Sequence, residues 1–188
     1  GDKNMTDKIK VGLIFGGNSS EYEVSIMSAH NIYEEIDTNK FDVYPMWITN
    51  DGYLADDADS RRVLDNPKME VANPHKVANI SNIVELKDRP EIDVFFPIVH
   101  GNLGEDGCLQ GLFRVLDKPF VGDDVLAAAV TMDKEMTKIL AQRAGVPVAK
   151  WIAVKRFEYN DPDNEKLDYE YVASQLGSDL FVKPSNQG

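Results

Sequence analysis

Cysteine is almost absent from this sequence: Cys108 is the single one among 188 residues. A disulfide within the chain is therefore excluded, which suits a reducing compartment and predicts a cytoplasmic protein. No apolar run approaches the roughly 18 residues that a membrane-spanning helix needs. The opening residues, GDKNMTDKIK, lack the apolar core of a secretory signal peptide. We expect residues 1–8 to be flexible, with Met5 as the natural start and the residues before it left from cloning.

Basic residues are in the minority, with 20 Lys and Arg against 32 Asp and Glu and a net charge of −12. An acidic surface repels nucleic acid and anionic lipid, so neither is an expected partner, although a local basic pocket could still bind a small anion. The hydrophobic fraction of 43% is enough to form a core, which argues against disorder.

Two common nucleotide-binding fingerprints are also missing from the first glycine turn, GLIFGGNSSEYEVS. Gly12, Gly16 and Gly17 do not form G-x-G-x-x-G, and Asn18 stands where a P-loop needs lysine. What remains is a strand, a glycine turn and a helix start whose free N–H groups could face an anion. This turn is either a simple connection or a ligand site, in which Glu21 projects into a cleft and binds an ammonium group.

The helix expected after this turn covers residues 21–37. Ser20 and Glu23 fit a capping box, in which the two side chains satisfy free N–H groups at a helix start. The predicted buried face consists of four apolar residues at helical spacing: Val24, Met27, Ile32 and Ile36.

Strands and helices are expected to alternate along the first two thirds of the chain. The predicted strands are 10–15, 41–49, 93–99 and 119–122, and the other helices are 108–117 and 123–145. A hairpin turn is expected at 50–52, and a loop region with a short helix at 55–80. This order predicts an α/β fold, with a parallel sheet covered by helices on both faces.

The character of the sequence changes after Pro147. Strand-like runs at 149–156 and 179–184 flank a predicted helix that Gly177 ends. We therefore expect an α/β domain over 9–133 and the start of a second, incomplete domain over 134–188.

The most glycine-rich stretch is VHGNLGEDGCLQG, residues 99–111, at the end of an apolar strand. His100, Glu105 and Asp106 suggest a metal site, but zinc sites combine several His or Cys ligands and here there is one imidazole. Two interpretations remain open: a capped helix start, or a catalytic loop where open α/β sheets place their ligands. Cys108 is expected to be a small buried residue.

Two lysines are further candidates. Lys134 lies on a predicted helix, where a lysine is usually solvated. Lys183 ends an apolar strand just before Pro184, where a lysine can act as a point charge for phosphate. His30 and His75 show no pattern that assigns them a role.

Taken together, ordered segments of this chain closely resemble the D-alanine–D-alanine ligase family of the ATP-grasp superfamily. The matching segments are VGLIFGGNSSEYEVSIMSA, VFFPIVHGNLGEDGCLQGLF, KPFVGDDVLAAAVTMDKEMTK, AGVPVAKW and LFVKPSNQG. The resemblance implies an N-terminal, pre-ATP-grasp α/β domain followed by the truncated start of the ATP-grasp domain. It also implies a homodimer that uses ATP and magnesium to join two D-alanines through an acyl phosphate, for peptidoglycan precursor synthesis.

The resemblance assigns roles around the first D-alanine. Glu21 matches the acid that holds its ammonium group, and Val24 matches an apolar contact near this substrate. His100 matches the histidine beside the substrate, and Glu105 an acid that orients the loop behind it. Glu21 and His100 are the residues we expect to be catalytic.

The resemblance also assigns Lys134 and Lys183 to the phosphates of ATP. The magnesium ligands, the adenine contacts and the discrimination of the second substrate are expected beyond Gly188, so no metal residue is predicted and this chain alone is expected to be inactive. A D-alanine–D-lactate or D-alanine–D-serine ligase, another ATP-grasp carboxylate–amine ligase, and a non-enzymatic α/β binding module are the alternatives.

Overall fold

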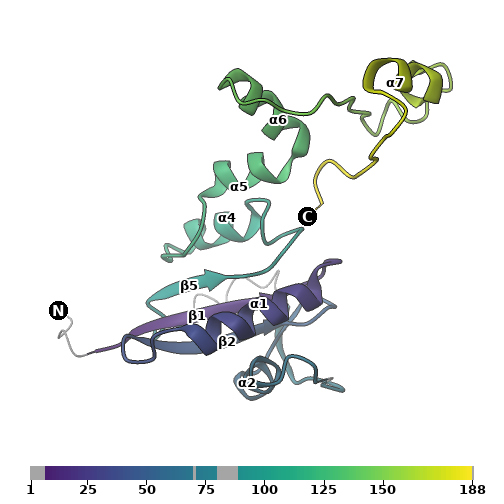
Figure 1. The fold of residues 1–188 in the computed structure, drawn as a ribbon. Coiled ribbons are helices and arrows are strands. Elements are labelled where there is room, and N and C mark those ends of the chain that lie inside the picture. The colour runs from purple at the N-terminus through teal and green to yellow at the C-terminus, as the bar shows by residue number, and fades with distance from the viewer. Residues whose placement is uncertain (1–6, 70, 80–88, 188) are drawn as a thin grey trace. The chain divides into compact units, whose positions relative to one another are not determined.

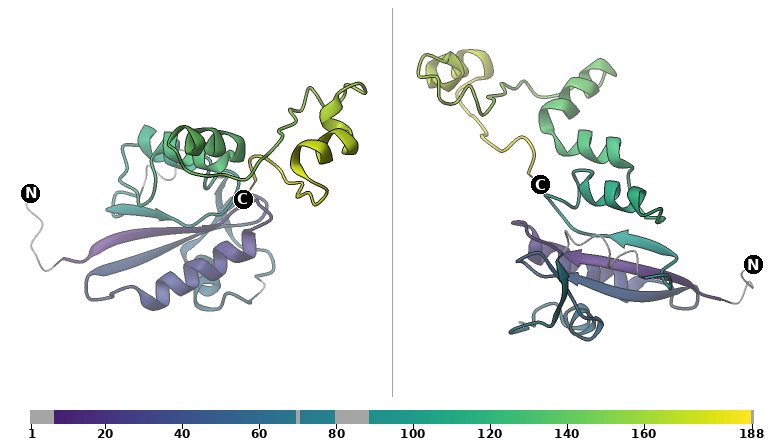
Figure 2. Two further views of the ribbon diagram at one scale, coloured as in Figure 1. Left: turned by 45° about the horizontal axis from the view of Figure 1, so that its top comes forward. Right: turned by 180° about the vertical axis from the view of Figure 1, so that it is seen from behind.

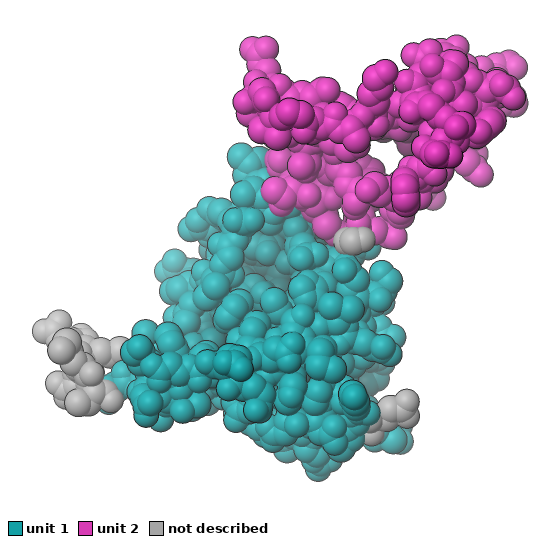
Figure 3. Space-filling view, viewed as in Figure 1, with its two compact units in different colours: residues 1–129, 188 teal, residues 130–187 magenta. Residues whose placement is uncertain are grey.

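The computed structural model describes residues 7–69, 71–79 and 89–187 (Figure 1). Most of the predicted flexible N-terminus lies outside these residues. The chain divides into two compact units, residues 1–129 and 130–187 (Figure 3). This division lies four residues before the predicted domain boundary at 133/134. The assignment of the second unit to an ATP-grasp domain stays a prediction.

Unit 1 is built on one sheet with the strand order β4-β3-β2-β1-β5. Its strands are β1 (Ile9–Gly16), β2 (Phe41–Ile48), β3 (Tyr53–Ala55), β4 (Lys76–Asn79) and β5 (Val94–Pro97). The central strand β1 pairs in parallel with both β2 and β5. The predicted strand at 119–122 is reduced to one parallel bridge, between Phe120 and Phe95.

The opposite edge of the sheet is antiparallel, because the predicted turn at 50–52 reverses the chain between β2 and β3. Gly52, with φ of 84°, supplies the left-handed backbone of that turn. Strand β4 then pairs antiparallel with β3. The expectation of a parallel sheet is therefore correct for the central strands and wrong for this edge. The short helix expected within 55–80 is confirmed as α2 (Asp57–Asp65), whereas β4 lies where a loop was expected.

Helices cover both faces of this sheet, as predicted (Figure 2). They are α1 (Tyr22–Glu35), α2 (Asp57–Asp65) and α4 (Cys108–Val115), and α5 (Val125–Met132) follows α4 in the chain. Alternate residues of β1 face opposite ways, so Leu13 and Phe15 pack with α1 and α2, while Ile14 packs with α4. Phe113 of α4 stacks on Phe95 with ring centroids 5.0 Å apart.

Helix α1 differs from its prediction in two ways. Its first residue follows Glu21, and no side chain caps its start, so the capping box is wrong. Its buried residues are Ser25, Ile26 and Ala29, whereas Val24 and Met27 are 54% and 37% exposed. The Ser25 hydroxyl explains this rotation, because it accepts from Gly16 N–H at 2.8 Å and donates to the Ile98 carbonyl at 2.6 Å.

Unit 2 contains α6 (Lys134–Arg143), a short 3-10 helix η1 (Glu165–Leu167) and α7 (Tyr169–Leu176). The predicted helix 123–145 is in fact α5 and α6, because Asp133 interrupts it and caps α6 by accepting from the N–H groups of Glu135 and Met136. Helix α7 is confirmed, with Gly177 after it.

The two strands predicted in unit 2 are wrong for the residues described. Residues 149–156 and 179–184 carry no strand pairing, and Phe181 and Val182 are 98% and 96% exposed. A strand is stable only when a neighbouring strand satisfies its N–H and C=O groups, and apolar runs alone do not supply that neighbour.

Candidate functional site

Two loops meet at the carboxyl ends of the parallel strands β1 and β5. One is residues 17–21, which lead into α1, and the other is residues 98–107, which lead into α4. Ser19 joins them: its hydroxyl donates to the His100 carbonyl at 2.9 Å and accepts from Glu21 N–H at 3.2 Å. Open α/β sheets bind ligands at this edge. The sequence-predicted Glu21 and His100 are thus brought to neighbouring loops of one unit.

The carboxylate of Glu21 is the first notable group. It lies against Gly101, where a Cβ would stand 3.2 Å from Glu21 Oε2. Gly101 has φ of 75°, a conformation that favours glycine. Glu21 Oε2 is buried and has no hydrogen-bond partner among the described residues. A buried carboxylate oxygen without a donor is costly, so this oxygen is suited to a cationic donor such as an ammonium group.

The His100 ring lies between α1 and its own loop. Its Nε2 is 3.1 Å from Ser28 Oγ, and its Nδ1 is 3.4 Å from Glu105 Oε1. The other oxygen of Glu105 accepts from Gly101 N–H at 2.8 Å, and Glu105 N–H donates to the Gly101 carbonyl at 3.0 Å. Glu105 therefore contacts both the ring and the backbone of the loop. Sequence reasoning missed Ser28, although its spacing of three from Ser25 puts two hydroxyls on one helix face.

The glycines of the second loop allow close packing of its backbone. A Cβ on Gly104 would stand 1.9 Å from the Val99 carbonyl oxygen. Gly107, with φ of 91°, precedes α4, and its Cβ would stand 2.9 Å from the Val125 carbonyl oxygen. The buried Gln110 side chain donates from Nε2 to the Gly104 carbonyl at 2.8 Å. Side chains at these glycines would displace the segment that carries His100.

Asp106 has a structural role in the same loop. Its carboxylate accepts from the N–H groups of Leu103 at 2.9 Å and Cys108 at 3.0 Å. Burial opposes ionisation, but these donors outweigh it and lower the pKa of Asp106. Across the described residues, no group of three or more His, Cys, Asp and Glu side chains is arranged to hold a metal ion.

Cys108 corrects another prediction. It is exposed rather than buried, because it is the first residue of α4 and follows the loop on the surface. Its hydrogen bond with Asp106, together with burial and the charge of that carboxylate, raises the pKa of the Cys108 thiol. A raised pKa makes the thiol a poor nucleophile.

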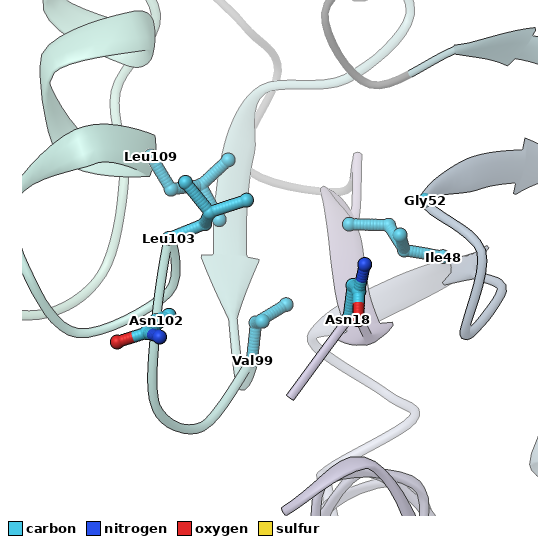
Figure 4. Close-up of a pocket in the computed structure, with 8 residues that line it drawn as sticks. Asn18, Ile48, Gly52, Val99, Asn102, Leu103 and Leu109 are labelled. Carbon is cyan, nitrogen blue, oxygen red and sulfur yellow. The ribbon is translucent and has the colours of Figure 1, made fainter. Parts of the chain in front are cut away.

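An open hollow lies beside these loops (Figure 4). Its lining is mostly apolar and consists of Gly17, Asn18, Ile48, Gly52, Val99, Asn102, Leu103 and Leu109. Leu103 and Leu109 lie on one side of it, and Asn18 and Ile48 on the other (Figure 4). Neither Glu21 nor His100 lines this hollow. The hollow is therefore separate from these two side chains, although the same loops line it.

The two candidate lysines belong to unit 2. Lys134 is the first residue of α6, and its backbone N–H donates to the Ser185 carbonyl at 2.8 Å. Its Nζ contacts the carbonyl oxygen of Gln187, and Ser185 Oγ donates to Asp133 at 3.2 Å. The segment that contains the exposed Lys183 is thereby held at the start of α6, so one small unit carries both cations.

These features define unit 1 as an α/β domain with a candidate ligand site at the carboxyl ends of parallel strands. The family described as D-ala D-ala ligase N-terminus matches residues 10–123, and the chain belongs to that family. A curated D-alanine–D-alanine ligase of Lactobacillus johnsonii is 99% identical over 184 residues, covering 98% of this chain and 51% of the relative.

Solved structures agree with this assignment. The D-alanine-D-alanine ligase from Coxiella burnetii has a TM-score of 0.72 at 31% identity, covering 96% of this chain and 54% of that chain. The VanG D-Ala:D-Ser ligase from Enterococcus faecalis has a TM-score of 0.66 at 32% identity, covering 97% of this chain and 53% of that chain. This chain therefore spans about half the length of the relatives it matches. Among the residues that the structure describes, no helix has the length and apolar character needed to cross a membrane.

Proposed function

We propose that the whole protein to which this chain belongs is an ATP-dependent, ADP-forming ligase that joins two D-alanines for peptidoglycan precursor synthesis. The observation that carries this proposal is the buried Oε2 of Glu21 next to Gly101, which has no hydrogen-bond partner among the described residues, in a chain of this family. In the proposed reaction the first D-alanine carboxylate accepts a phosphoryl group, the amine of the second D-alanine attacks the acyl phosphate, and phosphate leaves. We place this ligase in the cytoplasm, as a homodimer.

The residues of unit 1 serve the first substrate in this proposal. Glu21 would pair with its ammonium group, which supplies the donor that Oε2 lacks. His100, held by Glu105, would lie beside the substrate. The exposed Val24 would contribute an apolar contact near the start of α1. Such pre-arranged groups lower the barrier by positioning the reactants.

The residues of unit 2 serve ATP. Lys134 and Lys183 suit phosphate oxygens, because each can replace water with a fixed positive charge. Bound ATP would supply the phosphoryl group. The described residues do not fit a magnesium site, so we propose that its ligands come from elsewhere in the whole protein.

The test is turnover of the whole protein, followed as ADP release coupled to dipeptide formation. Glu21→Ala and Lys183→Ala should each lose activity, while Val115→Ala, a change of an exposed residue outside both sites, should not. Normal turnover in both site variants would reject the residue assignment. Dipeptide formation by the 188-residue chain alone would contradict the expected need for the other half.

A D-alanine–D-serine ligase is the second candidate, because one of the matched structures is a D-Ala:D-Ser ligase at 32% identity. A panel of D-alanine, D-serine and D-lactate as second substrates decides between them. A higher kcat/KM for D-serine or D-lactate than for D-alanine would overturn the proposed product.

A further inference from the structure

The ring of His100 has a polar partner at each nitrogen. Ser28 Oγ lies 3.1 Å from Nε2, and Glu105 Oε1 lies 3.4 Å from Nδ1. The two partners come from different parts of unit 1, since Ser28 is on α1 and Glu105 is in the loop before α4. The His100 side chain is 23% exposed, so protein surrounds most of the ring.

The chemistry of the partners decides where the protons lie. An ionised carboxylate can only accept hydrogen bonds, and one oxygen of Glu105 already accepts from Gly101 N–H. The Nδ1 of His100 must therefore donate to Glu105. In a neutral ring the other nitrogen, Nε2, then has a lone pair and needs a donor. The Ser28 hydroxyl can be that donor.

The backbone on which His100 sits is held independently of this ring. Ser25 Oγ donates to the Ile98 carbonyl, and Ser19 Oγ donates to the His100 carbonyl. These two hydrogen bonds hold the backbone and do not restrict rotation of the imidazole. Ser28 and Glu105 are the groups placed to restrict that rotation.

We propose that Ser28 is a positioning residue for His100, which it holds, together with Glu105, as the neutral tautomer protonated on Nδ1. The consequence for catalysis depends on the ligase function proposed above. Both ring nitrogens are hydrogen-bonded to groups of the protein. The orientation of the imidazole is therefore fixed before the first D-alanine binds. Loss of one such hydrogen bond should raise the KM for the first D-alanine about fivefold.

The direct experiment is 15N NMR of histidine-labelled whole protein without substrate, at a pH of about 8.5, with His100 assigned from a His100→Gln variant. The wild type should show a protonated Nδ1 and a bare, hydrogen-bonded Nε2. Ser28→Ala should move the Nε2 resonance and raise KM, and Ser28→Thr, which keeps the hydroxyl, should restore both. Ser20→Ala, which removes an exposed hydroxyl from the neighbouring loop, is the control and should change neither.

Protonation of Nε2 in the wild type would overturn the proposal, as would unchanged Nε2 resonance and KM in Ser28→Ala. The spectroscopic result does not depend on turnover. The expected tautomer, together with a moved Nε2 resonance in Ser28→Ala, in a protein that forms no dipeptide would support the role of Ser28 and reject the ligase function. A protein that forms the dipeptide normally but has a protonated Nε2 would support the ligase function and reject the role of Ser28.

Discussion

A pair of glycine substitutions tests whether the loop around His100 is packed as tightly as its backbone indicates. Gly104→Ala adds a Cβ that would stand 1.9 Å from the Val99 carbonyl oxygen and 2.6 Å from its carbonyl carbon. Both are backbone atoms, so the loop itself must move. Gly111→Ala adds the same methyl group inside α4, where no atom outside the helix lies within 4 Å of the new Cβ.

The two changes should have opposite signs. Overpacking a tight site costs roughly 1–3 kcal/mol, and the backbone clash places Gly104→Ala at about 3 kcal/mol. Replacing a glycine by alanine within a helix stabilises by roughly 0.5–1 kcal/mol, which applies to Gly111→Ala. With a urea m-value of about 2 kcal/mol/M, the unfolding midpoint falls by about 1.5 M in the first variant and rises by about 0.4 M in the second.

Urea unfolding followed by tryptophan fluorescence measures this difference. The chain has two tryptophans, and Trp47 is buried in the core of unit 1. Trp151 belongs to unit 2, so a Trp151→Phe background leaves Trp47 as the reporter of unit 1. A midpoint for Gly104→Ala within about 0.3 M of the parent, or a shift of the same sign in both variants, would refute the packing argument.

Three other predictions concern the charged groups of the site. Glu21→Gln keeps the size of the side chain but removes its charge, and should lower kcat/KM for D-alanine about 10- to 100-fold, as measured by steady-state kinetics of the whole protein. The lowered pKa of Asp106 means that its ionised form stabilises the fold above the usual aspartate pKa of about 4 and that this contribution is lost as pH falls below it. The stability advantage of the wild type over Asp106→Asn should therefore be full at pH 7 and shrink below about pH 4 in urea titrations, and a constant difference would contradict this. Labelling of Cys108 by a thiol reagent at pH 7.5 should be faster in Asp106→Asn, because the carboxylate that raises its pKa is gone, and an unchanged rate would exclude that cause.

Local sequence patterns were sufficient to predict most of the secondary structure of unit 1. The apolar runs at 10–15, 41–49 and 93–99 form β1, β2 and β5, because a buried parallel strand needs a short continuous apolar segment. The helix predicted over 108–117 also forms, as α4, and buries Leu109 and Phe113. In each of these cases one local signal and the final packing agree.

Local patterns failed where a distant group decides the outcome. Ser25 is buried in α1 because Gly16 and Ile98 supply its hydrogen-bond partners, and this turns Val24 outward. The runs at 149–156 and 179–184 have strand composition but no pairing among the described residues. A helix is hydrogen-bonded within itself, whereas a strand depends on a neighbour that composition does not reveal.

At the candidate site, too, some features follow from the sequence and others from the fold. The sequence by itself determined which chemical groups are present, since Glu21, His100, Glu105 and the glycines were all identified from their motifs. Only the tertiary structure decided how they are held. The clash that excludes a side chain at Gly104 depends on the fold of its own loop, because it is made with Val99. The Glu21 oxygen without a partner among the described residues and the contact of Ser28 with His100, 72 residues away, depend on two loops brought together by parallel strands. Residues this far apart in the chain meet only when β1 and β5 pair, so no local pattern could place them.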